Sequence, residues 1–483
     1  MRNSILRTFT EKGILVDPEA VEALSALPDP EGCIDRILGD TENRPLVITK
    51  EDVIEYAACL PTKAKAQDME RAKPRAPDEA IIRTARPVNV LRDVTGESTC
   101  VGNVIDFAKL FNDRFSTIRK MLAKRRELAG LLPISKAKKI HRDLRFVGMV
   151  YDSHATKNGH TLLELEDEDD KIMVLVMKGS LKTTDVFLKD EVVGIVGSFS
   201  KDGEIVIAKE IIRPEIPMNS GMTPNGSESI VAFVSDIHVG STTFLPEHWS
   251  RFIAWLRKDP VAQDINYIVM PGDLVDGIGI YPGQEEELVI EDVYDQYRTL
   301  AEMVKGIPDR ISTVMMPGNH DAVRLAEPQP ALSDDIKKIF DSRISFVGNP
   351  CLMEIEGRTI QAYHGRSFDD FIANSRHLTY ANPLDTMKEM LRRRHLAPIY
   401  GERTALAPEQ KDYLVMDRVP NIFVTGHVHK CAIADYKGIK LINASAWQSQ
   451  TSFQRMHNLV PDPAKVPMVH LGTGEMWVED FFA

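Results

Sequence analysis

Five short motifs in the second half of the chain carry side chains that bind divalent metals. The motifs are SDIHVG, PGDLVDG, PGNHD, YHGRS and TGHVH. Their carboxylate, amide and imidazole groups give seven candidate metal ligands: Asp236, His238, Asp273, Asn319, His364, His427 and His429. Residues two positions apart at a strand end point to the same face, so we expect each DxH and HxH pair to reach a common site.

These ligand types suit hydrolysis of a phosphodiester. That reaction needs neutralised charge on the phosphoryl oxygens and a hydroxide at neutral pH, and two cations about 4 Å apart supply both. Mixed imidazole, carboxylate and amide ligands favour Mn²⁺, Fe or Zn²⁺ over Ca²⁺. We therefore expect two divalent metal ions, with Mn²⁺ favoured and Mg²⁺, Fe or Zn²⁺ as alternatives.

Each motif taken alone has a plain structural explanation. A lone DxH occurs by chance, and a lone HxH on a strand is more often structural than a ligand pair. The specific signal is the order of five motifs, each directly after an apolar run. Together they predict a two-metal phosphodiesterase site.

The elements that must position these motifs are buried strands that alternate with helices. IVAFVSD, YIVMPGD, STVMMPGNH and IFVTGHVH are apolar runs bounded by turns, a pattern typical of an α/β sandwich or layered sheet. In open α/β folds the loops beyond the carboxyl ends of the strands form the active crevice. The candidate ligands fall in these loops.

The patterns in residues 1–228, before this sandwich, predict further modules, so the expected fold class is multidomain α+β. Apolar spacing in LVITKEDVIEYAACL and a capping box between Thr49 and Asp52 predict a helical N-terminal module. Five short alternating segments bounded by turns predict an OB-type β-barrel. The expected divisions are a helical module at 1–62, a polar linker at 63–95, a helical connector at 96–140, the barrel at 141–215, a second linker at 216–228 and the phosphoesterase sandwich at 229–483.

The barrel has two candidate roles, single-stranded nucleic-acid binding and protein docking. Its aromatic residues are sparse, and its loop at 166–170 has the sequence EDEDD. Because stacking on aromatic side chains is the usual basis of single-strand binding, docking is the favoured role.

Composition narrows the class of protein. The chain has 59 basic and 71 acidic residues, a net charge of -12, which argues against a large bare phosphate-binding surface. Its five cysteines are scattered without a CxxC pair, so a disulfide framework is not expected. Apolar stretches of about 18 residues are absent from the sequence, and we expect a soluble cytoplasmic protein with no membrane contact.

The motifs resemble those of the calcineurin-like phosphoesterase superfamily: D-x-H, G-D-x-x-D, G-N-H-D/E, H and G-H-x-H. The resemblance implies that Asp236, His238, Asp273 and His429 hold one metal, and that Asp273 as a bridge, Asn319, His364 and His427 hold the other. It also implies that His320, without a metal of its own, protonates the leaving oxygen or steadies the transition state. Asp321 either orients His320 or is a solvated carboxylate at a helix start.

The flanking segments resemble a narrower family, the small subunits of archaeal family D DNA polymerases. These segments are GDLVDGIGIYPGQEEEL, YHGRSFDD and RRRHLAPIYGERTALAPEQKDYLV. The resemblance implies a 3′–5′ exonuclease that acts on DNA 3′ ends and proofreads for a separate large catalytic subunit. The alternatives are a catalytically silent scaffold subunit and, less favoured, a phosphatase or cyclic-nucleotide phosphodiesterase.

Further residues are candidates for contacts with DNA or with a sliding clamp. Arg366, Arg394 and His395 are expected to line a groove for the DNA backbone, whereas a solvated helix face is favoured for Arg392 and Arg393. Tyr281 either stacks on a terminal base or packs structurally. The C-terminal EMWVEDFFA favours a final strand over a clamp-binding peptide, in which Glu475 would replace the usual leading Gln.

Overall fold

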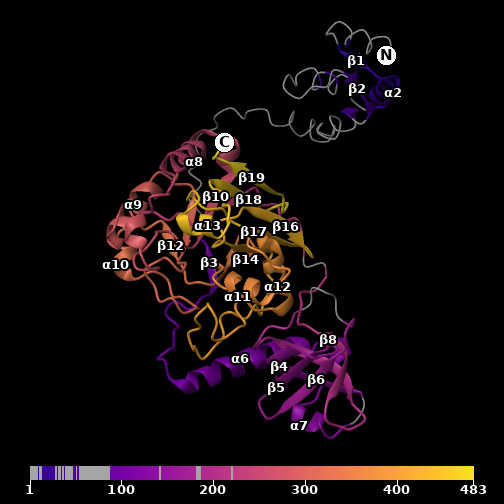
Figure 1. Ribbon diagram of the computed structural model, residues 1–483. Helices are drawn as coiled ribbons and strands as arrows, with labels where there is room; N and C mark the ends of the chain where they lie inside the picture. The colour runs from indigo at the N-terminus through magenta and orange to yellow at the C-terminus, as the bar shows by residue number, and fades with distance from the viewer. Residues whose placement is uncertain are drawn as a thin grey trace. The chain divides into compact units, whose positions relative to one another are not determined.

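The computed structural model describes residues 87–140, 143–180, 186–218 and 221–483, together with parts of the segment 9–53. The chain divides into two compact units, residues 1–82 and 83–483 (Figure 1). In the described part of the first unit, helix α2 (Pro18–Ala26) begins at Asp17, whose side chain accepts a hydrogen bond from the Glu19 amide. Strands β1 (Leu15–Val16) and β2 (Val47–Ile48) pair in parallel.

The predicted capping box at Thr49 and Asp52 is present. The Asp52 carboxylate accepts hydrogen bonds from the Thr49 amide at 2.7 Å and from the Thr49 hydroxyl at 2.9 Å. The helix expected over LVITKEDVIEYAACL therefore does not include Val47 and Ile48, which are extended because they precede the cap. Lys50, Asp52 and Val53 are helical, and residues 54–86, which include the rest of the predicted helix and most of the predicted linker, lie outside the described residues.

The C-terminal sandwich consists of two mixed six-stranded sheets. The first has the order β12-β11-β10-β9-β18-β19, with β9 (Ile230–Phe233), β10 (Ile265–Pro271), β11 (Ser312–Met316), β12 (Ile344–Phe346), β18 (Lys465–His470) and β19 (Met476–Asp480). The second has the order β16-β17-β15-β14-β13-β3, with β3 (Asn89–Arg92), β13 (Cys351–Ile355), β14 (Arg358–Ala362), β15 (Ile422–Thr425), β16 (Ala432–Tyr436) and β17 (Ile439–Asn443). The predicted α/β sandwich is thus present, and the C-terminal segment forms the predicted final strand.

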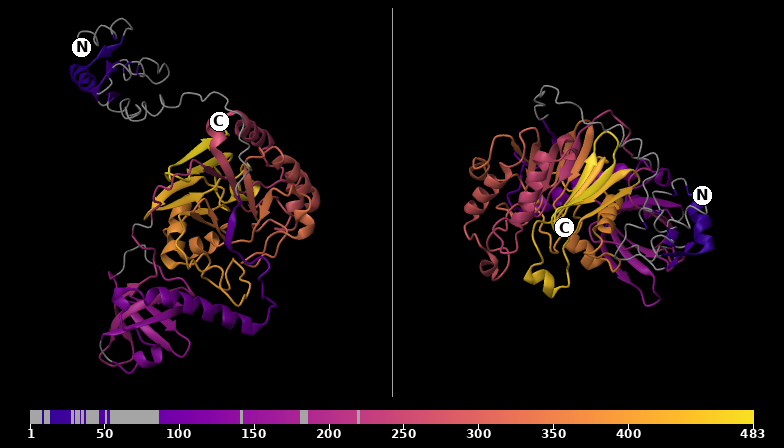
Figure 2. Two further views of the ribbon diagram at one scale, coloured as in Figure 1. Left: turned by 180° about the vertical axis from the view of Figure 1, so that it is seen from behind. Right: turned by 90° about the horizontal axis from the view of Figure 1, so that it is seen from above.

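Both faces of each sheet are covered, and alternate side chains on the central strands pack on opposite faces. On β9, Val231 and Phe233 pack between the sheets, and Ile230 and Ala232 pack against helices on the outer face. The helices over the first sheet include α8 (Pro246–Lys258), η2 (Val261–Asp264), α9 (Val293–Val304) and α10 (Asp334–Lys337). Those over the second are α11 (Phe368–Asn374) and α12 (Pro383–Arg393). The result is a four-layer α/β/β/α domain (Figure 2), and the remaining short helices, η3 (Gln284–Glu287) and α13 (Ser452–Met456), lie in its loops.

The five predicted barrel strands close into a barrel with the order β4-β5-β6-β8-β7. Their bounds are Leu144–Ala155 for β4, Thr161–Glu166 for β5, Lys171–Val176 for β6, Val192–Phe199 for β7 and Val206–Ile212 for β8. Helix α6 (Val104–Leu122) packs Phe115, Ile118 and Leu122 against the barrel and against Val415 of the sandwich. The short η1 (Arg126–Leu128) and α7 (Ile134–Ala137) complete the predicted helical connector.

Both predicted linkers contain segments that are bonded to the sandwich. Strand β3 lies at 89–92, inside the range predicted as a linker, and pairs antiparallel with β13. The β-branched and apolar residues of VNVL fit a strand at a sheet edge. In the second linker, the side-chain Nδ2 of Asn225 donates to the Glu356 carbonyl at 2.8 Å, and Arg358 donates to the Thr223 carbonyl at 2.5 Å.

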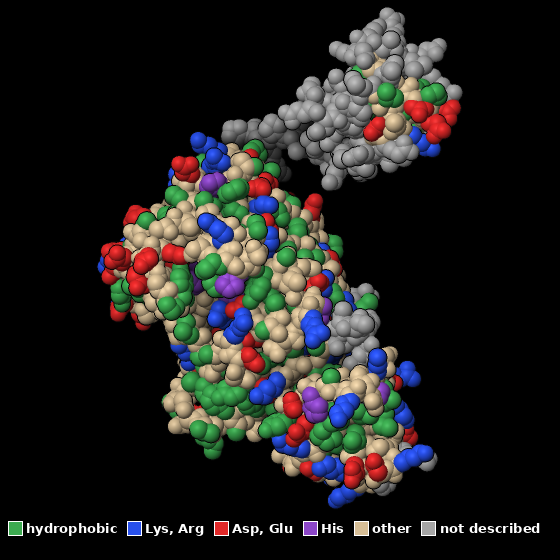
Figure 3. All heavy atoms as spheres, in the orientation of Figure 1, with side chains coloured by type: hydrophobic (Ala, Val, Ile, Leu, Met, Phe, Trp, Pro, Cys, Tyr) green, Lys and Arg blue, Asp and Glu red, His purple; other side chains and the backbone are tan. Residues whose placement is uncertain are grey.

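Among the helices of the described residues, none combines the length and the apolar character that crossing a bilayer requires. The longest, α6, carries charged residues along its length. In Figure 3, Lys/Arg and Asp/Glu side chains are interspersed over the face that is drawn.

Candidate metal centre

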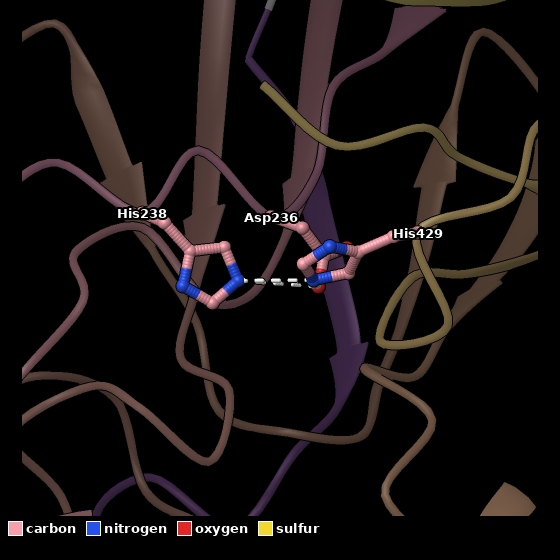
Figure 4. A group of neighbouring side chains, drawn as sticks. All are labelled: Asp236, His238 and His429. Carbon is pink, nitrogen blue, oxygen red and sulfur yellow. Dashed lines mark hydrogen bonds and ion pairs between the residues drawn. The ribbon is translucent and has the colours of Figure 1, made fainter. Parts of the chain in front are cut away.

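The seven candidate ligands converge where strands of both sheets end. Asp236 and His238 follow β9, Asp273 follows β10, Asn319 follows β11, His364 follows β14, and His427 and His429 follow β15. Three groups of donor atoms each lie within 4.8 Å of one another: Asp236, His238 and His429; His238, Asp273 and His320; and Asp273, His364 and His427. The first group is drawn in Figure 4.

Distances between donor atoms match one shared site with two halves. In the first half, Nε2 of His429 lies 3.1 Å from Nε2 of His238 and 3.5 Å from Oδ1 of Asp236. In the second, Nε2 of His364 lies 3.1 Å from Oδ1 of Asn319. Oδ2 of Asp273 lies 3.8 Å from Nε2 of His238 and 3.3 Å from Nε2 of His364, so its carboxylate reaches both halves.

The backbone at the ligands has an unusual conformation. Asp236, His238, Asp273, His427 and His429 all have positive φ, between 49° and 70°. Non-glycine residues in this region cost of order 1–3 kcal/mol each and cluster at functional sites. Five of the seven candidate ligands have this conformation. The loops therefore hold a strained backbone that directs these side chains into the site.

Two glycines allow the loops to approach this closely. A Cβ on Gly272 would lie 2.5 Å from Nδ1 of His364, and one on Gly426 would lie 2.5 Å from Oδ2 of Asp236. The position of Gly272 also has a φ of +100°, which L side chains rarely adopt. Both positions therefore require glycine.

Hydrogen-bond acceptors outside the cluster fix which ring nitrogen of His364 and His238 faces the site. Nδ1 of His364 lies 2.9 Å from the Pro271 carbonyl, which only accepts, so Nδ1 carries the proton and Nε2 presents a lone pair. Nδ1 of His238 lies 3.0 Å from the Asp276 carboxylate with the same consequence. This arrangement of ring orientation by acceptors is typical of metal-binding histidines.

The electrostatics of the site favour a cation. Burial alone would raise the pKa of Asp273, but the His364 and His320 imidazoles lower it well below the usual range. Burial would lower the pKa of His364, but the charges of Asp273 and Asp236 raise it to about 10. In the absence of a cation Nε2 of His364 therefore also carries a proton at neutral pH, and a bound metal ion would displace it to reach the lone pair. Burial lowers the pKa of His238. The buried carboxylates are therefore ionised at neutral pH, and the donor set fits a divalent cation in each half.

Three side chains that support the ligands carry no prediction of their own. Asp276 binds His238 and is held by Nε2 of Gln284, which donates to Oδ2 of Asp276 at 2.9 Å. The side-chain amide of Gln454 lies 2.9 Å from Nδ1 of His429. Asp276 follows Asp273 by three residues in GDLVDG, a usable signal, whereas nothing in the sequence marks Gln284 or Gln454.

His320 lies beside the cluster as predicted, but Asp321 does not orient it. Nδ1 of His320 lies 2.8 Å from the Asp276 carbonyl, and its ring centroid lies 4.7 Å from that of His238. The Asp321 carboxylate instead accepts from the Gly318 amide at 2.8 Å, the Leu274 amide at 3.1 Å and the Tyr297 hydroxyl at 2.9 Å. Asp321 is also buried, so it is not a solvated carboxylate. It ties together the loops that carry Asp273 and Asn319.

The predicted DNA-contact residues separate into two groups. Arg366 lies at the site: its NH1 donates to Asp369 at 2.9 Å, and Asp369 lies 3.5 Å from Nε2 of His427. Tyr281 is half-buried and donates its hydroxyl to Glu287 at 3.0 Å, an interaction that favours packing.

The other predicted groove residues are buried in structural contacts, so their prediction is wrong. Arg394 donates to the Met416 carbonyl at 2.7 Å, and Nε2 of His395 lies 2.9 Å from the Asp412 carboxylate. Arg393, for which a solvated face was favoured, is buried with Nε 2.6 Å from Glu191 of the barrel. Arg393 thus lies in the contact between barrel and sandwich, whereas Arg394 and His395 are bonded within the sandwich.

Burial of His395 predicts a pH dependence of stability. Burial and the nearby Arg114 lower the pKa of His395 to about 4, against about 6.5 for an unfolded histidine. Between these values the unfolded chain binds a proton that the folded chain does not, so stability falls as pH falls from about 6.5 to 4. We expect His395→Gln to flatten this part of the profile, measured as urea midpoints across that range. A profile parallel to that of the unaltered chain would contradict the prediction, and exposed His154→Gln is the control.

Comparison with known proteins identifies the family of the chain. A family model for the B subunit of DNA polymerases alpha and epsilon matches residues 231–432, the region that holds all seven candidate ligands. This region of the sandwich is therefore similar to the B subunits of DNA polymerases. The chain is 38% identical to the DNA polymerase II small subunit of Methanothermobacter thermautotrophicus, over 97% of this chain and 98% of that protein. It is 37% identical to that of Halobacterium salinarum, over 99% and 98%.

The chain belongs to the family of archaeal DNA polymerase II small subunits, the family D small subunits predicted from its flanking motifs. Membership of this family implies that the chain has a large catalytic subunit as its partner. Among solved structures, one titled as a novel archaeal phosphodiesterase aligns with 52% of this chain and 98% of its own at 9% identity and a TM-score of 0.26, a similarity too low to carry a functional inference.

Proposed function

We propose that this chain is a metal-dependent 3′–5′ exonuclease that proofreads DNA within a heterodimeric polymerase. The observation that carries the proposal is the convergence of the seven candidate ligands into two halves joined by Asp273. Asp236, His238, Asp273 and His429 would hold one cation, and Asp273, Asn319, His364 and His427 the other. Two bound cations, with Mn²⁺ favoured, supply a hydroxide at neutral pH and neutralise charge on the phosphoryl oxygens.

The protein's own groups around the ligands have separable roles. Asp276 and the Pro271 carbonyl hold His238 and His364 in the tautomer that presents Nε2. His320 keeps Nδ1 on the Asp276 carbonyl, so Nε2 is the atom at which it would give a proton to the leaving oxygen. Arg366, partly exposed beside Asp369, would contact a phosphate of the strand that enters the site.

The test is digestion of single-stranded DNA by the chain alone and by its complex with the large subunit. With Mn²⁺ and a 5′ label we expect a ladder that shortens from the 3′ end, and a chelator should stop it. His427→Ala should abolish the ladder, and exposed His154→Ala should leave it unchanged. If the unaltered protein cuts no DNA in either form, the exonuclease is excluded and a scaffold role is favoured.

A further inference from the structure

A short helix beside the metal centre presents apolar side chains to solvent. In α13, Phe453 is 55% exposed and Met456 74% exposed, and Val460 just beyond the helix is 63% exposed. Figure 2 shows this helix projecting from the body of the sandwich in the view from above. Exposed large apolar groups at a fixed position beside a polar site indicate a binding surface.

The segment 451–462 is anchored to the candidate ligands, so the exposed side chains keep a defined place. Gln454 contacts Nδ1 of His429 at 2.9 Å, and the Asp462 amide donates to the His429 carbonyl at 2.8 Å. Thr451 and Gln454 form a capping box at the start of the helix. The Ser452 hydroxyl also donates to Glu287, which joins the segment to the loop after Asp276.

Successive helix residues point about 100° apart, so Gln454 can face His429 while Phe453 faces solvent. The Phe453 ring lies against the His457 ring, with centroids 4.2 Å apart and an angle of 34°. Residues 451–461 contain one arginine and one histidine and no acidic residue, which suits a phosphate-bearing ligand. Aromatic side chains with neighbouring cationic groups are the usual platform for unpaired bases.

We propose that Phe453 stacks on the base of the 3′-terminal nucleotide of single-stranded DNA whose last phosphodiester lies at the metal centre. The inference rests on the proposed exonuclease for the identity of the ligand and adds its recognition element. An unpaired terminal base exposes the π face that this contact needs, whereas a paired base is stacked within the duplex. The site would therefore take frayed or mismatched ends in preference to paired ends.

The test uses 2-aminopurine, a base whose fluorescence falls on stacking, at the 3′ end of single-stranded DNA. A methylphosphonate as the last linkage prevents cleavage, so binding is measured apart from hydrolysis. With the full chain we expect quenching, which Phe453→Trp retains and Phe453→Ala loses. The alanine variant should bind about five- to tenfold more weakly, and a 3′ end without a base should remove this difference.

The matched control is Phe482→Ala, because Phe482 is 49% exposed and also lies against a histidine ring, that of His248, with centroids 5.1 Å apart. We expect it to bind and quench as the unaltered chain does. Quenching that survives Phe453→Ala would overturn the proposal, as would equal quenching of 2-aminopurine at the 5′ end. If Phe453→Ala quenches normally but no longer associates with the large polymerase subunit, the surface belongs to a protein contact instead. Quenching that depends on Phe453 in a chain that cuts no DNA would support the stacking contact and refute the exonuclease.

Discussion

Asp273→Asn is expected to slow metal-dependent removal of 3′-terminal nucleotides by about 10³-fold or more, a loss of several kcal/mol of transition-state stabilisation. The Asp273 carboxylate is the group that reaches both halves of the site, at 3.8 Å from Nε2 of His238 and 3.3 Å from Nε2 of His364. An amide of the same shape removes the negative charge that both halves share. The effect should therefore exceed that of replacing a ligand in one half only.

The measurement is a single-turnover rate on labelled single-stranded DNA, together with the metal content of the protein after dialysis against Mn²⁺. We expect the asparagine variant to lose rate and bound metal together while it still associates with the large subunit. Asp264→Asn, at an exposed site in η2, is the matched control and should retain both. An Asp273→Asn protein that cuts DNA at an unaltered rate would remove the bridging role.

Arg114→Ala is expected to lower the free energy of unfolding by about 3–5 kcal/mol, the usual result of breaking a buried ion pair from one side. Arg114 on α6 is fully buried, with Nε donating to Asp412 at 2.7 Å and NH1 donating to the Pro398 carbonyl at 2.5 Å. Without the guanidinium, the buried Asp412 carboxylate keeps only neutral partners and His395. The helix that joins barrel and sandwich would then lose its central polar contact.

Urea unfolding at neutral pH measures this loss, and activity in folded protein should change little because Arg114 does not belong to the metal centre. Arg114→Lys should recover part of the stability, since a lysine keeps the charge but not the planar fork. Lys305→Ala, which breaks the exposed pair with Glu302, should have almost no effect. A loss below about 1 kcal/mol for Arg114→Ala would contradict the structural role given to this contact.

The buried strands of the sandwich and the candidate ligands that follow them could be predicted because each motif couples two local signals. An apolar run such as that in IVAFVSD predicts a buried strand. The DxH or HxH motif that follows predicts metal-binding side chains at the end of that strand. Parallel strands bring such ends to one edge of a sheet, so the ligands that follow strands of the same sheet are expected to lie together. That the two sheets bring these edges to each other, so that Asp273 reaches His364, is seen only in the fold. The barrel was predictable for a similar reason, since alternation and turn residues are local.

Contacts between modules could not be predicted in this way. Arg393 is expected on a solvated helix face, and only the folded chain brings Glu191 of the barrel to it. His395 is expected to line a DNA groove, and only the fold of the sandwich brings Asp412 to it. Asp321 resembles a helix-start carboxylate in the sequence, yet it accepts hydrogen bonds from Gly318 of its own loop, from Leu274 of the loop after β10 and from Tyr297 of helix α9. The same limit applies to Gln454, whose contact with His429 joins two strand-end loops 25 residues apart.

The most direct measurement is the rate at which the assembled heterodimer shortens a primer whose 3′ end is mismatched, with Mn²⁺ and without nucleotides for synthesis. Complexes that contain the unaltered small subunit should remove the mismatched nucleotide, and complexes that contain Asp273→Asn should leave the primer intact. That pair of results would place a proofreading nuclease at this metal centre. Equal shortening by both complexes would assign the nuclease to another site, and no shortening by either would leave the chain as a scaffold.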